Sequence, residues 1–362
     1  MEFENILNRA LKMEPISFEE GILLYNHAPS SLLMFYADQI RKRLHPDNKV
    51  GWIIDRNVNI TNICFSQCSF CNFCRRKNSD DAYITTIEQY REKIDQLFAL
   101  GGKQLLLQGG MNPELGLVFY KNLFTLLKNE YPALKLHALG PPEIVYLARK
   151  EGLTFREVLL ELINAGLDSL PGAGAEILSE RVRKNISPAK ATVDEWLEVM
   201  REAHKLNLPT SATMMAGHIE TREERVMHLI KLRDLQSEKP EGSYGFITFI
   251  PWPFQHKNTL LYKYSGVMNN IDGPEYIRLI AISRIILNNI PNIQASLLTV
   301  GKEIAMMSLH SGANDLGSIM IEENVIRSAG DIHIFDSDTI CSIIKEAGFT
   351  SVKRNQKYEP EN

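Results

Sequence analysis

Four cysteines, Cys64, Cys68, Cys71 and Cys74, lie within the eleven-residue stretch CFSQCSFCNFC, and they constrain this chain more than any other feature. The chain has 362 residues and five cysteines, of which only Cys341 stands apart. A disulfide framework would spread its cysteines to close long loops and would need an oxidising compartment. Closely spaced thiolates suit a zinc ion or an iron–sulfur cluster better. We therefore expect a metal site on this loop.

The spacing leaves two ligand sets open. Cys64, Cys68 and Cys71 form CxxxCxxC, and Cys74 adds a further CxxC interval. Four thiolates would complete the tetrahedron of a structural zinc ion and make the loop a clip in a zinc-stabilised binding protein. Three thiolates would leave one iron of a cluster open to a substrate or a cofactor, as catalytic metals require. Only the second arrangement predicts a reactive site.

The composition narrows the classes of partner. Acidic residues number 44 against 40 basic ones, a net charge of −4, which argues against a nucleic-acid surface because such surfaces need clustered Lys and Arg. No apolar run approaches the roughly 18 residues that span a bilayer, so membrane insertion is not expected. The first residues, MEFENILNRALK, lack the basic start and apolar core of a signal peptide. We expect a cytoplasmic protein.

Alternating strands and helices predict an α/β fold after a helical extension at residues 1–48. Three capping boxes mark helix starts, Thr86 with Gln89, Thr192 with Glu195 and Thr221 with Glu224. The expected strands are NVNIT from Asn57, KQLLLQ from Lys103, KLHAL from Lys135, LDSL from Leu167, PTSATMM from Pro209, GFITFI from Gly245, NIQASLL from Asn292 and GSIMI from Gly317. Eight strands predict a (β/α)₈ TIM-type barrel over residues 49–355, with an open doubly wound sheet as the competing fold and a polar, solvated tail at residues 356–362.

The cysteine loop resembles the radical S-adenosylmethionine superfamily, whose CxxxCxΦC signature is present as Cys64, Cys68, Phe70 and Cys71. The resemblance implies a [4Fe–4S] cluster on the three thiolates and S-adenosylmethionine on its open iron, with Phe70 near the adenine. Reductive cleavage would then give a 5′-deoxyadenosyl radical, which implies an electron donor such as flavodoxin or ferredoxin.

The second expected strand ends in a segment similar to the GGE motif of the superfamily. Gln108, Gly109 and Gly110 are followed here by Met111 in place of Glu. The resemblance implies that the backbone of the glycines contacts the methionine amino group of the cofactor, and glycine permits such close approach. A simple turn after the strand would account for the two glycines equally well.

Longer segments resemble the futalosine branch of menaquinone biosynthesis, namely QGGMNPEL from Gln108, AGLDSLPGAGAEIL from Ala165, ATMMAGHIETREER from Ala212, FIPWPFQHKNT from Phe249 and LHSGANDLGSIMIEEN from Leu309. Within this branch, the segments resemble the enzymes that cyclise dehypoxanthine futalosine more than they resemble the sister aminofutalosine synthases. The implied radical removes the ribose C4′ hydrogen, and the carbon radical attacks the benzoate ring; the cyclised ring radical then loses one electron and one proton. Cys74 departs from the pattern of the branch.

Other polar residues are candidates for the remaining roles. His218 is the first candidate for the base, with Glu220 beside it, although local hydrogen bonding and a helix start would explain both. Glu176 in GAGAE is a candidate cofactor contact, and His137 is either a proton carrier or a core histidine.

The benzoate carboxylate calls for a cation, for which Arg56, Arg75 and Arg181 are candidates that also fit a solvated surface. His310, Asn314 and Asp315 would either hold sugar hydroxyls or form a polar turn. Trp252 and Phe254 would either stack on the aromatic ring of the substrate or pack in the core.

Overall fold

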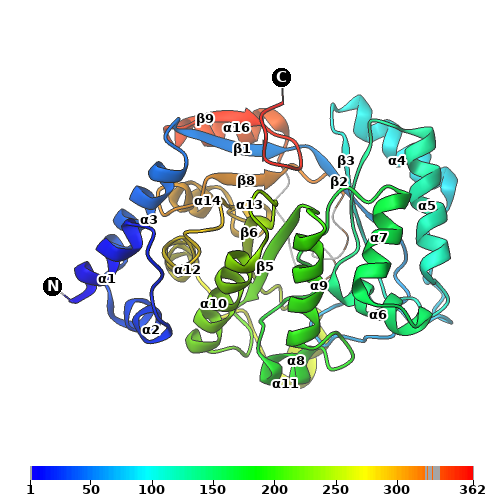
Figure 1. Cartoon of the computed structure of the whole chain (residues 1–362), viewed down its shortest axis with the longest axis horizontal. Helices are drawn as coiled ribbons and strands as arrows, with labels where there is room; N and C mark the ends of the chain where they lie inside the picture. Colours follow the sequence, from blue (N-terminus) through cyan, green and yellow to red (C-terminus); the bar gives the residue numbers. More distant parts are fainter. Residues whose placement is uncertain (1, 323, 325–327, 329–334, 362) are drawn as a thin grey trace.

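The computed structural model describes residues 2–322, 324, 328 and 335–361. Glu323 of the MIEEN motif lies outside these residues. The expected helical extension consists of three helices, α1 (Glu2–Leu11), α2 (Phe18–His27) and α3 (Ser30–Leu44), and these stand beside the rest of the molecule (Figure 1). Helix α2 packs on α10 (Arg222–Glu238) and α3 packs on α12 (Gly273–Ile286), so the helical extension is fixed to the outer face of the barrel.

Parallel strands form the centre of the molecule. They are β1 (Lys49–Ile53), β2 (Asp55–Asn59), β3 (Gln104–Gln108), β4 (Lys135–Ala138), β5 (Thr210–Ala216), β6 (Phe246–Pro253), β7 (Asn292–Ile293), β8 (Asp315–Ser318) and β9 (Thr350–Lys353). Hydrogen bonds join them into three parallel sheets with the orders β8-β1-β9, β2-β3-β4 and β5-β6-β7.

Short bridges close these three sheets into a ring. Ser169 pairs with His137 of β4 and Leu170 pairs with Thr210 of β5, so residues 169–170 join the second sheet to the third. Gln294, directly after β7, pairs with Asp315 of β8. Strand β1 pairs with β8, strand β2 pairs with β3, and only Ile54 separates β1 from β2. The segment formed by β1 and β2 therefore joins the first sheet to the second. The expected (β/α)₈ barrel is therefore confirmed, with β9 as an added strand on β1.

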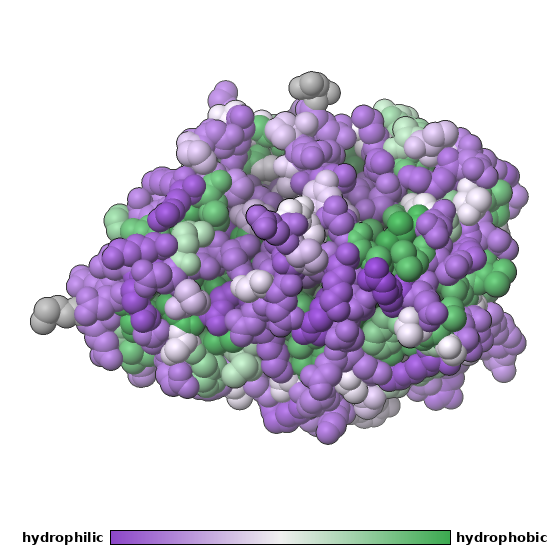
Figure 2. All heavy atoms as spheres, in the orientation of Figure 1, coloured by the Kyte–Doolittle hydropathy of each residue, from purple (hydrophilic) through white to green (hydrophobic). Residues whose placement is uncertain are grey.

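Most of the helices after the extension cover the outside of the ring, whereas α13 (Leu297–Val300) borders the cavity through Leu297 and Leu298. The helices after the extension are α4 (Ile87–Ala99), α5 (Leu117–Glu130), α6 (Pro141–Glu151), α7 (Phe155–Ala165), α8 (Glu180–Ile186), α9 (Val193–Lys205), α10 (Arg222–Glu238), α11 (Leu260–Ser265), α12 (Gly273–Ile286), α13 (Leu297–Val300), α14 (Lys302–Leu309) and α16 (Ser337–Glu346). All three expected capping boxes form, and Ser17 with Glu20 and Thr154 with Glu157 make two further ones. Hydrophilic residues predominate on the face in Figure 2, with hydrophobic residues in smaller groups between them.

Strand β3 shows why the barrel encloses a space. Leu105 and Leu107 point outward and are fully buried under the helices, whereas Gln104, Leu106 and Gln108 line the interior. Barrel interiors are usually filled by branched apolar residues, and polar inward positions instead suit a cavity. Within the described residues, no helix is both long and apolar enough to span a membrane.

The expected solvated tail at residues 356–362 is only partly exposed where the structure describes it: Lys357, Glu359 and Pro360 are exposed, whereas Gln356 is buried. Backbone hydrogen bonds hold this segment in a turn beside β9, from Asn355 N–H to Glu359 O at 2.8 Å and from Glu361 N–H to Lys353 O at 2.8 Å. Gln356 is only 9% exposed and donates to Ser169 Oγ at 3.1 Å. Gln356 and Tyr358 of this segment border the cavity inside the barrel.

Candidate active site

A cavity of about 380 Å³ lies inside the barrel. The cysteine loop lines one end of it, where the carboxyl ends of the strands meet, and Arg354, Gln356 and Tyr358 line the other. All four clustered cysteines border this space. The cysteine loop therefore lies at the carboxyl ends of the strands, where barrel enzymes have their active sites.

The cysteine loop follows β2 and is held by its backbone. Cys64 N–H donates to Arg75 O at 3.1 Å, Phe65 N–H donates to Met111 O at 3.1 Å, and Ser69 N–H donates to Ile186 O at 2.8 Å. These bonds attach the loop to itself, to the end of β3 and to α8. The cysteines are thus presented by a loop that backbone hydrogen bonds attach to the neighbouring elements.

Cys74 differs from the other three cysteines in its contacts. Its Sγ donates to the carbonyl of Cys64 at 3.2 Å. A hydrogen bond from Cys74 lowers the pKa of Cys64 to about 6, while the same contact raises the pKa of Cys74. Burial raises the pKa of Cys68 to about 11 and also raises that of Cys71. Cys74 is therefore placed as a thiol donor to Cys64, and the ligand set of Cys64, Cys68 and Cys71 stays a prediction.

The donor set fits an iron–sulfur cluster. Thiolates on one zinc ion must converge because each Zn–S bond is only about 2.3 Å long, whereas a cluster holds its thiolates on different iron atoms. Three soft thiols on one loop, bordering a cavity, suit an iron–sulfur cluster with an open position.

Lys190 supplies positive charge beside the cysteines. It forms an ion pair with Glu176 at 2.9 Å, and its Nζ lies 5.1 Å from the centre of the Phe70 ring. Burial lowers the pKa of Lys190, but the charges of Cys68 and Glu176 outweigh burial and raise it. A buried ammonium stabilises nearby thiolates, which are the form that binds metal. Phe70 and Glu176, both candidate cofactor residues, are thus brought together at this end of the cavity.

Gly109 and Gly110 are required by packing against the cysteine loop. A Cβ at Gly110 would overlap the carbonyl oxygen of Ile63, and one at Gly109 would lie 2.9 Å from that of Thr61. Gly110 N–H donates to Thr61 O at 2.7 Å. Both glycines and Gln108 border the cavity. We expected these glycines to allow a cofactor to approach the backbone closely. In the structure they allow the end of β3 to pack closely against the backbone of residues 61–63.

Glu143 is a further carboxyl at this end that sequence reasoning missed. It lies in the first turn of α6 and lines the cavity, and its Oε2 has no hydrogen-bond partner among the described residues. Burial raises the pKa of Glu143 to about 7. Its position in the ordinary helix start PPEI gives no sequence signal, since acidic residues are common in first turns.

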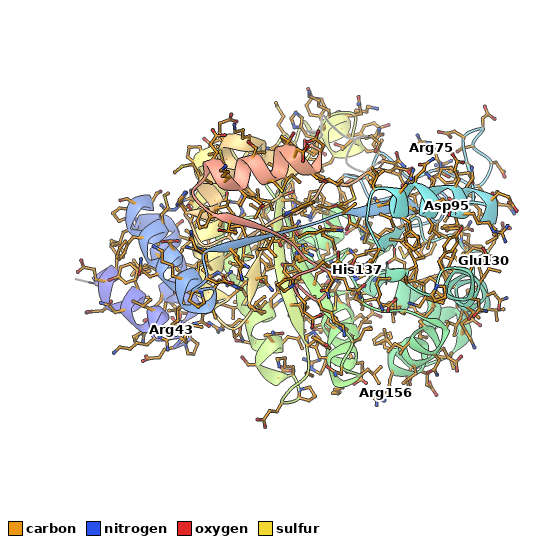
Figure 3. All side chains as sticks on the ribbon, turned by 90° about the horizontal axis from the view of Figure 1, so that it is seen from above. Arg43, Arg75, Asp95, Glu130, His137 and Arg156 are labelled. Carbon is orange, nitrogen blue, oxygen red and sulfur yellow. The ribbon has the colours of Figure 1, made fainter. Side chains whose placement is uncertain are left out.

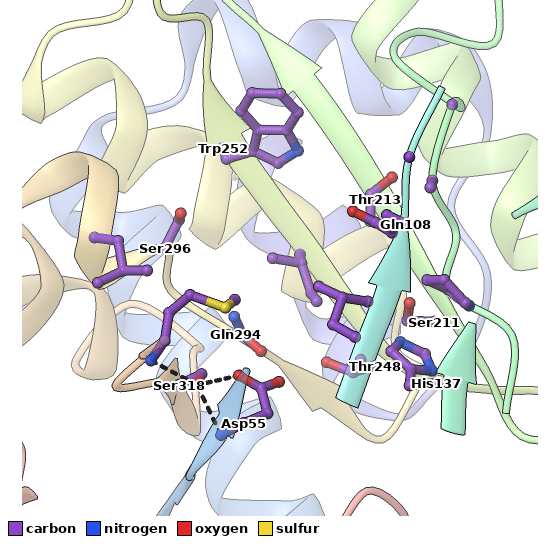
Figure 4. A pocket seen from close by; sticks show the side chains of 18 of the residues that line it. Asp55, Gln108, His137, Ser211, Thr213, Thr248, Trp252, Gln294, Ser296 and Ser318 are labelled. Carbon is purple, nitrogen blue, oxygen red and sulfur yellow. Dashed lines mark hydrogen bonds between the residues drawn. The ribbon is translucent and has the colours of Figure 1, made fainter. Parts of the chain in front are cut away.

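A ring of polar side chains lines the middle of the cavity and its deep end, which is the end lined by Arg354, Gln356 and Tyr358. Figure 4 shows several of them around one space, together with Trp252. They come from successive strands or the residues just after them: Asp55, Gln104, His137, Ser211, Thr248, Gln294 and Ser318. His137 lies inside the molecule, whereas Arg75 lies near its edge (Figure 3). Burial lowers the pKa of His137 to about 4, so its imidazole is neutral near pH 7.

His218 and Glu220 do not line the cavity. His218 contacts Met215 O through Nε2 at 3.0 Å and accepts from Ile219 N–H through Nδ1 at 2.7 Å. Burial lowers the pKa of His218. Glu220 accepts from the backbone of Gly217 and His218 and pairs with Arg225 at 2.7 Å. In this structure both side chains brace the loop after β5, as the local alternative predicted.

Most of the other residues that we considered for substrate contacts also lie outside the cavity lining. Arg56 pairs with Glu322, Arg75 with Asp81 and Arg181 with Glu224, and none of the three lines the cavity. His310, Asn314 and Asp315 also lie outside its lining, and Phe254 is buried against His218. Trp252 does border the cavity. The cations that line it are Lys190 and Arg354, neither of which the sequence pointed out.

Comparison with known proteins shows the family. Residues 58–232 match the Radical SAM superfamily, and residues 243–362 match the CofH/MqnC C-terminal region. Over 359 residues the chain is 38% identical to cyclic dehypoxanthine futalosine synthase of Halalkalibacterium halodurans, covering 99% of this chain and 95% of the relative. The chain belongs to the radical SAM superfamily. This radical SAM protein is an enzyme whose cofactors are a [4Fe–4S] cluster and S-adenosylmethionine, which excludes the zinc-stabilised binding protein.

Other relatives carry a different name. The chain is 39% identical over 314 residues to the 5-amino-6-(D-ribitylamino)uracil–L-tyrosine 4-hydroxyphenyl transferase of Methanopyrus kandleri, covering 86% of this chain and 84% of the relative. Among solved structures, methylornithine synthase has a TM-score of 0.71 at 16% identity, covering 96% of this chain and 97% of that one. That likeness supports the barrel fold alone.

Proposed function

We propose that this radical SAM enzyme cyclises dehypoxanthine futalosine in menaquinone biosynthesis. The observation that carries the proposal is the 38% identity to cyclic dehypoxanthine futalosine synthase, which extends over almost the whole of both chains. The barrel supports it, because a polar cavity leads inward from the cysteine loop. When bound, the cofactors supply a 5′-deoxyadenosyl radical, which takes the hydrogen from ribose C4′.

The protein's part in this reaction is to fold and enclose the substrate. The carbon radical must attack the benzoate ring of the same molecule, so the chain between the sugar and the ring has to be held bent. A cavity closed at its deep end by Arg354 and Tyr358, with Trp252 at its wall, restricts that chain and keeps water away from the radical.

One proton has to leave after cyclisation. To restore aromaticity, the cyclised ring radical must give one proton to a base and one electron to an acceptor, for which we propose the cluster in the oxidised form that it would have after radical formation. His137 is the histidine among the cavity-lining residues, and its Nδ1 contacts Ser169 Oγ at 2.7 Å. A neutral imidazole in this place is able to accept the proton. We therefore assign His137, rather than His218, as the proton acceptor.

The direct test is product analysis. Anaerobically reconstituted enzyme receives S-adenosylmethionine, a reductant and dehypoxanthine futalosine deuterated at C4′. We expect a product two hydrogens lighter than the protiated substrate and one deuterium in the free 5′-deoxyadenosine, with neither formed by Cys68→Ala. In a separate assay the enzyme receives the enolpyruvyl-type olefin substrate of aminofutalosine synthase, and addition of the adenosyl group to it, without cyclisation of dehypoxanthine futalosine, would indicate that reaction instead. Absence of any cyclised product from dehypoxanthine futalosine would refute the proposal.

The relatives from archaea support a second candidate function. Because the identity to the hydroxyphenyl transferase is equally high, the same enzyme should be offered tyrosine with 5-amino-6-(D-ribitylamino)uracil. Transfer of a hydroxyphenyl group in that assay, without cyclisation in the first, would favour the transferase.

The proposed reaction also needs an electron donor and a reducing compartment. We propose flavodoxin or ferredoxin as the donor, because radical formation begins with transfer of one electron. The five cysteines are all free of disulfides, which suits the cytoplasm. Replacement of the chemical reductant by reduced flavodoxin in the cyclisation assay would test the donor.

A further inference from the structure

The deep end of the cavity contains a carboxylate that faces the space in which the substrate would lie. Asp55, the first residue of β2, is 6% exposed and borders the cavity (Figure 4). Its Oδ1 accepts from the hydroxyl of Ser318, and its Oδ2 accepts from Gln104 Nε2 at 3.1 Å. A carboxylate has about four acceptor positions, so Asp55 retains capacity for further donors.

Two amide oxygens near the same end lack any donor. Gln104 Oε1 and Gln356 Oε1 are buried and unpaired in the described structure, and both residues line the cavity. Because a carboxylate only accepts, Gln104 must turn its NH₂ toward Asp55, which leaves its oxygen free. Gln356 directs its Nε2 to Ser169 Oγ. Buried acceptors without donors cost free energy, and a ligand that donates would remove this cost.

Among the described residues, this end offers no unpaired cation to an anionic group. Arg354 is the cation there, but Asp315 already neutralises it through two hydrogen bonds, Nε to Oδ2 at 2.5 Å and Nη2 to Oδ1 at 2.9 Å. Asp55 is a second acidic side chain beside this pair, and burial raises its pKa. A carboxylate of the substrate would meet the amide oxygens of Gln104 and Gln356, which only accept, whereas hydroxyl groups would donate to them.

We propose that Asp55, Gln104 and Gln356 form a subsite for sugar hydroxyls, so that the substrate enters this radical SAM enzyme with its sugar end first and keeps its benzoate carboxylate away from Asp55. This assignment rests on the proposed function and adds to it the orientation of the substrate. It makes Asp55 a positioning residue that binds the sugar hydroxyls.

Binding without turnover tests the subsite. Enzyme loaded with the cluster and S-adenosylmethionine, but without reductant, is titrated calorimetrically with dehypoxanthine futalosine, with methyl β-D-ribofuranoside and with 3-acetylbenzoate. Asp55→Asn should raise the Kd of the first two probes by about ten- to a hundredfold, the effect of losing hydrogen bonds to a charged group. Its affinity for 3-acetylbenzoate should be unchanged or higher. Asp234→Asn, on the outer face of α10, is the matched control and should change none of the three.

Several outcomes overturn the subsite. Unchanged or tighter binding of dehypoxanthine futalosine to the Asp55→Asn variant would show that the sugar does not contact Asp55. If that variant does not fold, Gln356→Met takes its place, and a loss of affinity of about two- to tenfold is expected from one neutral hydrogen bond. A third outcome separates the two proposals. If methyl β-D-ribofuranoside binds in a manner that depends on Asp55, but the enzyme does not cyclise dehypoxanthine futalosine, the subsite is supported and the proposed function is refuted. If wild-type enzyme binds neither sugar-containing probe, the subsite is refuted.

Discussion

At the scale of single residues, the motif predicts the position of the cluster but not the function of each neighbour. CxxxCxΦC predicts Cys64, Cys68 and Cys71 as cluster ligands with Phe70 beside them, because the spacing of ligands within one loop is local. Lys190, Glu143 and Asp55 reach the cavity from separate elements. No local pattern distinguishes such residues from surface charges, and only the closed barrel brings them together.

Cys74→Ser tests the assignment of three ligands. A serine hydroxyl is able to keep the hydrogen bond that Cys74 donates to the carbonyl of Cys64. We expect the variant to retain the iron content of wild type, whereas Cys64→Ser, Cys68→Ser and Cys71→Ser should each lose most of it. Iron and sulfide analysis after anaerobic reconstitution provides the measurement. Loss of iron from Cys74→Ser comparable to the other three would show that Cys74 is a ligand.

A buried histidine gives a prediction for pH dependence. His228 on α10 accepts from Leu178 N–H at 2.9 Å, and burial lowers the pKa of His228 to about 3. In the unfolded chain its pKa is about 6.5. Below that pH the unfolded state binds a proton that the folded state excludes, so this histidine makes folding less favourable as the pH falls toward about 3.

His228→Gln removes that proton linkage. Its free energy of unfolding should fall less on acidification than that of wild type, and the difference should approach about 1.4 kcal/mol per pH unit below pH 6.5. Urea unfolding of both proteins at pH 7.5, 6.5 and 5.5 gives the comparison. A constant gap between the two proteins at all three values would contradict the expectation.

At the scale of elements, regular patterns predicted most strands and helix starts. PTSATMM and GFITFI are long apolar runs and became β5 and β6, and the capping boxes formed because they depend on residues three apart. LDSL forms only bridges at Ser169 and Leu170. Strands β1 and β9 were missed, because KVGWI and TSVK are short and are stabilised by pairing with each other. Long-range pairing of this kind has no local signature.

The segment after β9 depends on a buried ion pair. Arg354 and Asp315 are 5% and 0% exposed, and two hydrogen bonds join them. Arg354→Met leaves Asp315 without its partner and should lower the free energy of unfolding by about 3–5 kcal/mol. Because Asn needs no counter-charge, Asp315→Asn in the same chain should recover part of that loss. Thermal and urea unfolding of the single and double variants form the cycle, and additive effects would show that the pair is not coupled.

At the scale of the whole molecule, the helical extension acts as a brace for the barrel. Tyr25 of α2 accepts a hydrogen bond from Arg225 at 3.0 Å, and Arg225 also pairs with Glu220 in the loop after β5. Arg278 of α12 donates to three carbonyl groups at the end of α2, those of Leu24, Tyr25 and Ala28. The sequence predicted this extension from its helical spacing, but its docking on α10 and α12 could not be predicted because it depends on side chains about 200 residues away.

Tyr25→Phe tests this brace. The change removes one acceptor of a buried guanidinium and should lower the free energy of unfolding by about 1.5–3 kcal/mol. Tyr36→Phe is the matched control, because Tyr36 donates to Asn8 within the extension itself at an exposed position, and its effect should be about 0.5 kcal/mol or less. Equal effects of the two changes would argue against a coupling between extension and barrel.

The polar void inside the barrel has a consequence for the amount of protein in a cell. A chain with unsatisfied acceptors such as Gln104 and Gln356 around an open space is less stable than a filled barrel, and any metabolite that occupies the space stabilises the native state by mass action. Proteases remove chains from the unfolded population. The lifetime of this enzyme should therefore lengthen when its substrate is abundant. The concentration of the metabolite would then influence the steady-state amount of the enzyme.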